Sequence, residues 1–174
     1  MKKILLLFTA AGLLSLTSCN NDDDVVVADG NNIAEVFQVN DVDFLPNDYQ
    51  VLVPLDPALY AEDVILVYRQ TYDASANVNV WQLIPRTIYL SDGGEVDYDY
   101  NFTVNDLLIY MDANFNLNEI PGSLTQNQVF RIAIIPGSVD GTAKGSNLEK
   151  YKDYDTVAAQ YGITEGDVKT LKVK

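Results

Sequence analysis

The sequence of 174 residues carries 25 acidic and 11 basic side chains, a net charge of −14 at pH 7, one cysteine and no histidine. Such an acidic excess excludes nucleic acid as a partner, because phosphate groups demand a basic surface. One cysteine and no histidine exclude internal disulfides, cysteine–histidine catalysis and Cys/His zinc sites. The length allows one domain with a single core.

The first 18 residues have the pattern of a secretory signal peptide. A lysine-containing start is followed by the almost wholly apolar stretch 4–16 and then by the small residues Thr17 and Ser18. The alternative is a membrane-spanning helix, but these 13 apolar residues would rise only about 20 Å against a hydrocarbon core of about 30 Å. We therefore expect residues 1–18 to be a cleaved leader.

The chain's one cysteine follows the leader in the sequence Leu16-Thr17-Ser18-Cys19. This stretch resembles the lipobox of bacterial lipoproteins, with a small residue directly before the cysteine and a leucine three positions before it. The resemblance implies that Cys19 carries diacylglycerol and that its new amine is acylated, for example with palmitate. Two or more acyl chains hold a protein on a membrane durably. Cys19 is thus the predicted lipidation site; the alternative is an unmodified cysteine beside an ordinary cleavage site.

Residues 19–32 are rich in Asn, Asp and Gly and are expected to form a flexible tether, although Val25-Val26-Val27 is also compatible with an edge strand. The tether begins with Asn20-Asn21-Asp22-Asp23-Asp24, which resembles the acidic export signal of surface lipoproteins of Bacteroidota. This resemblance implies an outer-membrane protein on the cell surface. The alternative is an outer-membrane lipoprotein that faces the periplasm, in which the acidic run is only a solvated spacer.

Between residues 33 and 136, short runs rich in β-branched and aromatic residues alternate with turn-forming residues. About seven or eight strands at this spacing predict a mainly β domain, an antiparallel Ig-like β-sandwich. The predicted strands are 36–44, 49–55, 64–72, 78–84, 87–90, 96–103, 107–112 and 129–136.

The faces of some strands can be predicted as well. Apolar and polar residues alternate along 96–103, which indicates one buried and one wet face. The runs 64–68 and 130–135 are nearly apolar on both faces and are predicted to be central strands. Trp81 and Leu83 are expected to cover the core from a neighbouring strand.

The C-terminal part is expected to be helical. Residues 137–147 form a Gly/Ser-rich connector, aromatic and apolar residues recur near helical spacing over 148–161, and Gly162 is placed to end a helix. Residues 164–167 have a capping-box pattern that leads into a helical turn or an edge strand. We expect 148–174 to be an appendage packed on the sandwich.

Three segments, 80–87, 100–106 and 127–136, are similar to a group of short flavobacterial lipoproteins of unknown function. The resemblance extends over roughly residues 33–173. It implies a fold and a location and no catalytic residue, because its motifs are structural. No Gly-x-Gly-x-x-Gly motif follows a predicted strand, which excludes a dinucleotide-binding domain.

The polar segment 112–119 is a candidate metal site, because its side-chain oxygens match the first three ligand positions of a calcium loop. Leu117 stands where the loop requires glycine, and Ser123 stands where a glutamate should close the site. We expect a polar loop without a cofactor. The alternative is an irregular Ca²⁺ site with ligands from Asp112, Asn114, Asn116 and Glu119.

Asp97 and Asp99 stand about 7 Å apart on one strand face, next to Asn101. Inverting glycosidases space their carboxylates in this way. A catalytic acid needs a raised pKa, however, and a flat wet face provides no cleft or apolar burial. We therefore expect a solvated face and no enzyme.

Eleven tyrosines, six phenylalanines and one tryptophan favour a core with cross-strand aromatic pairs. A stacking platform for glycans is the alternative, with Tyr60, Tyr72, Trp81 and Tyr89 as candidates. Asp155-Thr156-Val157 also resembles the short O-glycosylation site of Bacteroidota proteins.

These features together predict a lipid-anchored outer-membrane lipoprotein that acts as a non-catalytic structural or interaction module. Its protein or glycan partner cannot be identified from the sequence. The alternative is a ligand-binding lipoprotein for glycan or calcium.

Overall fold

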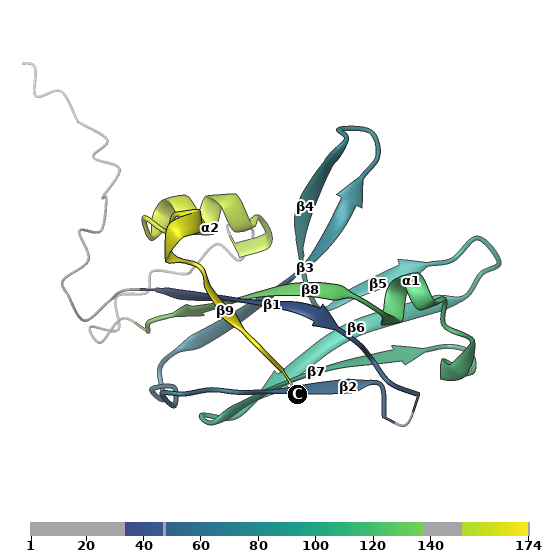
Figure 1. Cartoon of the computed structure of the whole chain (residues 1–174), viewed down its shortest axis with the longest axis horizontal. Helices are drawn as coiled ribbons and strands as arrows, with labels where there is room; N and C mark the ends of the chain where they lie inside the picture. Colours follow the sequence, from purple (N-terminus) through teal and green to yellow (C-terminus); the bar gives the residue numbers. More distant parts are fainter. Residues whose placement is uncertain (1–33, 47, 138–150, 174) are drawn as a thin grey trace, which may run out of the picture.

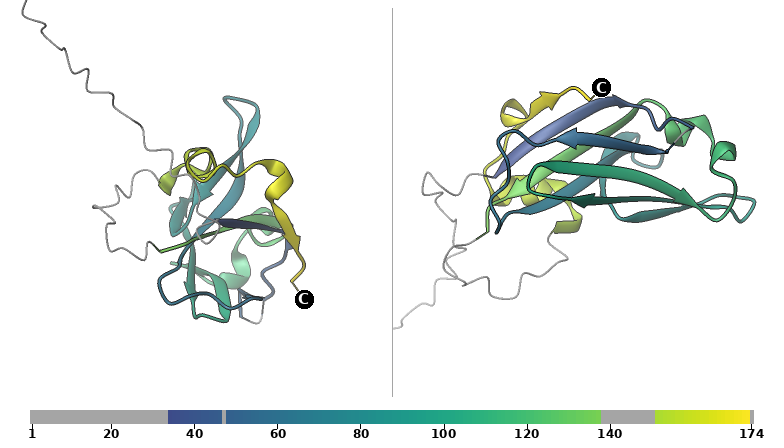
Figure 2. Two further views of the ribbon diagram at one scale, coloured as in Figure 1. Left: turned by 90° about the vertical axis from the view of Figure 1, so that its left-hand side faces the viewer. Right: turned by 90° about the horizontal axis from the view of Figure 1, so that it is seen from below.

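A computed structural model describes residues 34–46, 48–137 and 151–173 of the chain. The fold is mainly β: two sheets lie face to face and enclose a core, and the few helices are short (Figures 1 and 2). The leader, Cys19, the tether and most of the 137–147 connector lie outside the described residues. Their predicted roles stay predictions.

The first sheet has the strand order β4-β3-β8-β1-β9. All its pairs are antiparallel except β1 with β9, which is parallel. The strands β3 and β8 lie inside the sheet, which confirms the prediction of two central strands from their apolar faces. The bounds are β1 Glu35–Val42, β3 Val64–Asp73, β4 Val78–Leu83, β8 Gln128–Ile135 and β9 Lys169–Leu171.

The second sheet has the order β2-β7-β6-β5 and is antiparallel throughout. With it, all eight predicted strands are confirmed, and their ends differ from the prediction by no more than about two residues. In β6, Val96 and Tyr98 are buried as the alternation predicts, whereas Phe102 at the strand's end is 45% exposed. The bounds are β2 Gln50–Pro54, β5 Arg86–Tyr89, β6 Glu95–Phe102 and β7 Asp106–Ala113.

The main core lies between the two sheets. Phe44 packs edge-on against Tyr98 of the second sheet and Phe130 of the first, with 6.0 Å between ring centroids in each pair. Such edge-to-face contacts add to the free energy of burying the rings. Other fully buried members of this core are Val39, Val53, Val67, Val96, Leu107, Ile109 and Ile132.

A second apolar cluster lies on the outer face of the first sheet, under α2 (Tyr154–Gln160). Tyr68 packs edge-on against Tyr154, and its hydroxyl donates a hydrogen bond to the Tyr151 carbonyl at 2.6 Å. Trp81 and Leu83 pack on this second cluster. The expectation that they cover the main core was wrong, because α2 supplies a second apolar layer on the opposite face.

The helix α2 is shorter than the predicted helix, and its ends follow from local sequence. Asp153 caps the start, where its carboxylate accepts a hydrogen bond from the Thr156 amide at 3.1 Å. Gly162 has a positive φ of 65° and ends the helix as predicted. The bond from the Ile163 amide to the Ala158 carbonyl at 2.8 Å completes a Schellman motif.

Beyond α2, the predicted capping box is present at Thr164 and Asp167 and starts the helical turn η3 (Glu165–Asp167). This turn leads into β9, so a helical turn and an edge strand both occur. Two short helices were not predicted, η1 (Leu117–Glu119) and α1 (Gly122–Thr125), because so few residues carry no periodic pattern.

Candidate functional site

Three of the candidate calcium ligands, Asp112, Asn114 and Asn116, lie at the end of β7 and before η1, and their side-chain oxygens accept local hydrogen bonds. The fourth, Glu119, is the last residue of η1. The Asn114 side chain accepts from the Glu95 amide at 2.9 Å, and Asn116 accepts from the Asn118 amide at 3.1 Å. Asp112 accepts from the amide of Ala113. Within the described ranges, no group of three or more Asp, Glu, His or Cys side chains is placed to hold a metal ion.

The acidic pair of β6 lies on the outer face of the second sheet, because Val96 and Tyr98 between them point into the core. Asp97 accepts a hydrogen bond from the Thr87 hydroxyl on the neighbouring strand, and Asp99 accepts from the Tyr110 hydroxyl at 3.1 Å. The bonds hold each carboxylate to its own cross-strand neighbour. The two carboxylates therefore do not point toward a common position at which a substrate could bind.

The four aromatic candidates differ in exposure. Tyr60, Tyr72 and Tyr89 are 79%, 60% and 75% exposed, and they come from three different segments of the fold. Trp81 is half-buried, with its ring 5.9 Å from that of Tyr154. Trp81 therefore belongs to the packing under α2 and offers no free stacking face there.

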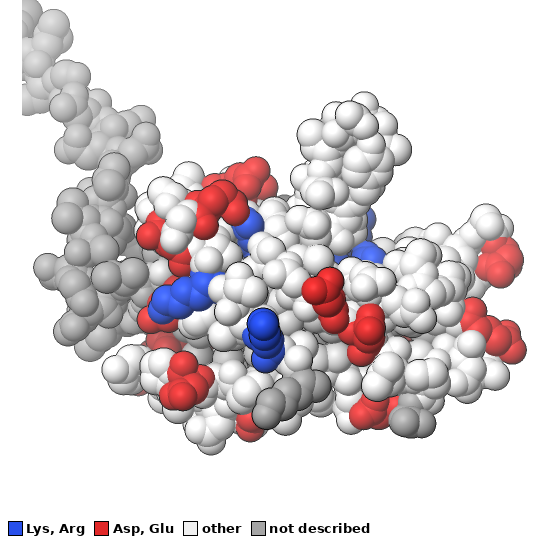
Figure 3. Space-filling model, in the orientation of Figure 1, with Lys and Arg blue, Asp and Glu red and all other residues white. Residues whose placement is uncertain are grey.

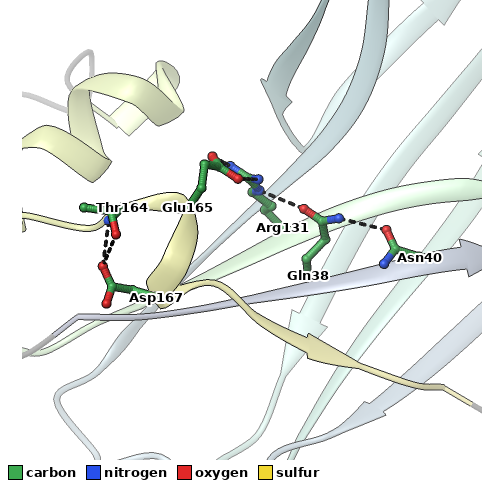
Figure 4. A network of polar contacts seen from close by, with 6 residues as sticks. All are labelled: Gln38, Asn40, Arg131, Thr164, Glu165 and Asp167. Atoms are coloured by element: carbon green, nitrogen blue, oxygen red, sulfur yellow. Dashed lines mark hydrogen bonds and ion pairs between the residues drawn. The ribbon is translucent and has the colours of Figure 1, made fainter.

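A buried arginine ties the C-terminal segment to the sheet (Figure 4). Arg131 of β8 donates two hydrogen bonds to Glu165 of η3, at 2.8 and 2.5 Å, and a third to Gln38 of β1 at 3.0 Å. Its guanidinium carbon lies 4.3 Å from the ring centroid of Trp81 and 4.7 Å from that of Tyr154. The guanidinium thus joins β1, β4, β8, α2 and η3 at one point.

The electrostatics of this cluster favour the charged pair. Burial acts to lower the pKa of Arg131, but Glu165 and the neighbouring groups outweigh it and raise that pKa. Hydrogen bonding from Arg131 holds the pKa of the Glu165 carboxyl below its ordinary value. The Arg131 side chain is 6% exposed and that of Glu165 76%, so the pair lies at the boundary with solvent. We infer a docking role for it, because it holds η3 of the C-terminal segment against β8 of the sheet.

The hairpin of β3 and β4 extends beyond the sheet (Figures 1 and 2). Strand β8 pairs with β3 only as far as Arg69, whereas β4 pairs with β3 up to Asp73. Asp73 orders the turn, because its carboxylate accepts from the Ser75 amide at 2.8 Å. Residues 70–73 and 78–81 therefore form a two-stranded ribbon, a structure with little stability of its own in water.

This ribbon carries almost no charge. Asp73 is the single ionisable carboxylate or cation in residues 70–85, apart from tyrosine, although the chain as a whole has 36 acidic and basic residues. The projecting hairpin is accordingly white in Figure 3, while red and blue side chains are scattered over the body. Tyr72 is 60% exposed and Val78 is 48% exposed.

The outer edge of β4 is open to another strand. Among the described residues, the sheets end at β4, β9, β2 and β5, and each of these has one strand neighbour. Charged residues or proline protect three edges: Lys169 in β9, Pro54 in β2 and Arg86 in β5. The sequence Val78-Asn79-Val80-Trp81-Gln82-Leu83 of β4 has neither. The β4 edge is therefore the candidate interaction surface.

A groove of about 590 Å³ lies at the opposite end of the first sheet, beside β1 and β9. Its floor includes Phe37, Ile134 and Leu171, and its rim carries Glu35 and Asp63. Lys169 pairs with Glu35 at 2.9 Å across this region.

Comparisons of the chain with family models, with curated proteins and with solved structures found no match. Within the part of the chain that the structure describes, no helix has the length and apolar character needed to cross a membrane. We therefore infer the function from the sequence and the structure of this chain alone.

The Arg131–Glu165 pair generates a pH-dependent prediction. Because the pKa of Glu165 is lowered in the fold, its contribution to stability is complete above its ordinary pKa of 4.5 and disappears as the pH falls through the lowered value. We expect Glu165→Gln to lower the free energy of unfolding by about 1 kcal/mol at pH 7. The difference from the wild type should shrink below about pH 4.5. Urea unfolding followed by Trp81 fluorescence measures the free energy of unfolding of the wild type and the variant at pH 7 and below about pH 4.5.

The matched control is Glu35→Gln, which breaks a pair whose two side chains are 61% and 41% exposed. Such a surface pair contributes little, so its loss should cost less than about 0.5 kcal/mol. Equal losses in the two variants, or a Glu165→Gln protein as stable as the wild type at pH 7, would contradict the docking role.

Proposed function

We propose that this protein is an outer-membrane lipoprotein, acylated at Cys19 and displayed on the cell surface, that acts as a non-catalytic interaction module. The lipobox-like Leu16-Thr17-Ser18-Cys19 and the acidic run behind it support the anchor and the location. The observation that carries the interaction role is the uncharged, unprotected β4 edge on a projecting hairpin. Membership of the group of short flavobacterial lipoproteins is part of the same proposal.

The partner is an extended, uncharged segment of another envelope protein, which adds to β4 as a further strand. Strand addition takes its affinity from backbone hydrogen bonds and its specificity from alternate side chains. On β4, Val78 and Val80 alternate with Asn79 and Trp81, so the two faces of an added strand would meet different surfaces. A second copy is disfavoured, because two bodies with the same large acidic excess repel each other.

The Ig-like form of the sandwich stays a prediction. Two sheets around one core support it. The strand order differs from the ABED and CFG sheets of an Ig constant domain, since β1 and β2 here lie in different sheets. A protein with a glycan ligand is the second candidate function, favoured by the exposed Tyr72 near the tip of the hairpin.

The anchor is tested by Cys19→Ala. We expect this variant to incorporate no labelled fatty acid and to leave the membrane fraction, because the thiol that carries diacylglycerol is gone. Ser18→Ala is the matched control, since it keeps a small residue before the cysteine and should be labelled like the wild type. Fatty-acid labelling of the Cys19→Ala protein would refute lipidation at this residue.

The interaction role is tested by photo-crosslinking in intact cells, with a photoreactive amino acid at position 78 or at position 104. Val78 lies on the β4 edge and Val104 in the turn between β6 and β7, and both are 48% exposed. We expect a discrete adduct from position 78 and none from position 104. An adduct of twice the chain mass would mean that a second copy occupies the edge. No adduct, or equal adducts from both positions, would contradict the proposal.

A further inference from the structure

A second buried arginine lies on the inner face of the first sheet. Arg69 of β3 is 8% exposed, and its Nε and Nη2 donate hydrogen bonds to Gln128 Oε1 at 2.9 and 2.6 Å. Its guanidinium carbon lies 4.4 Å from the ring centroid of Tyr98. Burial raises the pKa of Tyr98 to about 12, so this ring is neutral at pH 7 and provides no counter-charge.

Arg69 and Arg131 have similar positions in the sheet but differ in whether a carboxylate pairs with them. They come from adjacent strands and lie at neighbouring register positions, with Arg69 opposite Phe130 and Arg131 opposite Tyr68. Arg131 has a bidentate carboxylate partner, Glu165. Arg69 has no ion pair with any carboxylate in the described part of the chain, and burial lowers its pKa. A buried charge without a counter-ion is unfavourable, and an anion bound beside it would offset that cost.

Arg69 borders a groove of about 410 Å³ at the base of the β3–β4 hairpin. No acidic side chain lines this groove, although 25 of the chain's residues are acidic. Most of its other lining side chains are uncharged hydrogen-bonding groups, and Tyr72 adds a ring that is 60% exposed. The polar lining consists of Gln70, Thr71, Ser123, Gln126, Asn127 and Gln128.

We propose that this groove binds an acidic sugar, with the carboxylate of a uronic acid unit at the Arg69 guanidinium. Two N–H groups of the guanidinium are held by Gln128, and the rest of its fork matches the two oxygens of a carboxylate. The amide and hydroxyl side chains of the lining suit the hydroxyl groups of a sugar ring. This site is separate from the β4 edge and does not depend on its partner.

Arg69 also has a structural role that an experiment must separate from binding. Gln128, which accepts from Arg69, donates in turn to the Ser123 and Gln126 carbonyls at 3.0 and 2.6 Å and so orders the β7–β8 connection. Arg69→Met keeps the length of the stem and removes the charge, but it leaves the buried Gln128 Oε1 without its two donors, so the variant's folding must be checked before its binding is measured. Arg69→Lys keeps the positive charge but loses the planar pair of N–H donors that a guanidinium presents to a carboxylate.

The test is binding of sodium glucuronate and galacturonate to the folded protein at constant ionic strength, measured by calorimetry and by the shift in melting temperature. Glucose and acetate are the control ligands. We expect saturable binding of both uronates, at least tenfold weaker binding of glucose and acetate, and a loss of at least tenfold in affinity for Arg69→Met. Arg86→Gln, which removes a cation of the exposed edge strand β5 outside the groove, should bind like the wild type.

The same titration followed by nitrogen–proton NMR on the wild type does not depend on any variant folding. Uronate should shift the Arg69 Nε signal and the amide signals of Thr71 and Asn127, and should leave the Arg131 Nε signal in place. The proposal is overturned by an absence of saturable uronate binding, by acetate binding as tightly as uronate, or by unchanged affinity in a folded Arg69→Met protein. Shifts that bypass Arg69 would overturn it as well.

Discussion

The packing of Arg131 against the adjacent rings of Trp81 and Tyr154 is the contact on which the outer half of the structure depends. It joins the C-terminal segment to the sheet and covers an apolar cluster that water would otherwise reach. The bidentate bond to Glu165 fixes the direction in which the chain continues, so that β9 meets β1 in parallel. A guanidinium suits this position because it stacks and forms a fork of hydrogen bonds at once.

The C-terminal segment docks at the β9 edge of the first sheet and does not extend the sheet at its β4 edge. The C-terminal segment covers the outer face and supplies β9 at one edge, while β4 at the opposite edge extends past β8 and has no strand beyond it among the described residues. The uncharged ribbon and the groove beneath it with Arg69 therefore lie on the part of the fold that is open to partners. Of the two buried arginines, Arg131 has a carboxylate partner and docks the C-terminal segment, whereas Arg69 has none among the described residues and is the one for which we propose a ligand.

Much of the fold could be predicted from sequence because its signals are local. Each strand carries its own run of β-branched and aromatic residues, and the caps at Gly162 and Thr164 each depend on a few neighbouring residues. The cap at Asp153 was not predicted, because the apolar spacing placed the helix start at residue 148. The sites could not be predicted in the same way, since Arg131 meets Glu165 across 34 positions and Arg69 meets Gln128 across 59. The available signal was an arginine inside each of two apolar strands, a residue that is almost never buried without a partner.

We propose that a surface-displayed, lipid-anchored domain offers its β4 edge and groove to partners outside the cell. Protease treatment of intact cells that express the tagged protein, compared with lysed cells, tests this display. We expect intact cells to lose the protein, and we expect replacement of Asp22, Asp23 and Asp24 by alanine to protect it while acylation continues. Loss of the protein in lysed cells alone would contradict surface display and would place the domain in the periplasm.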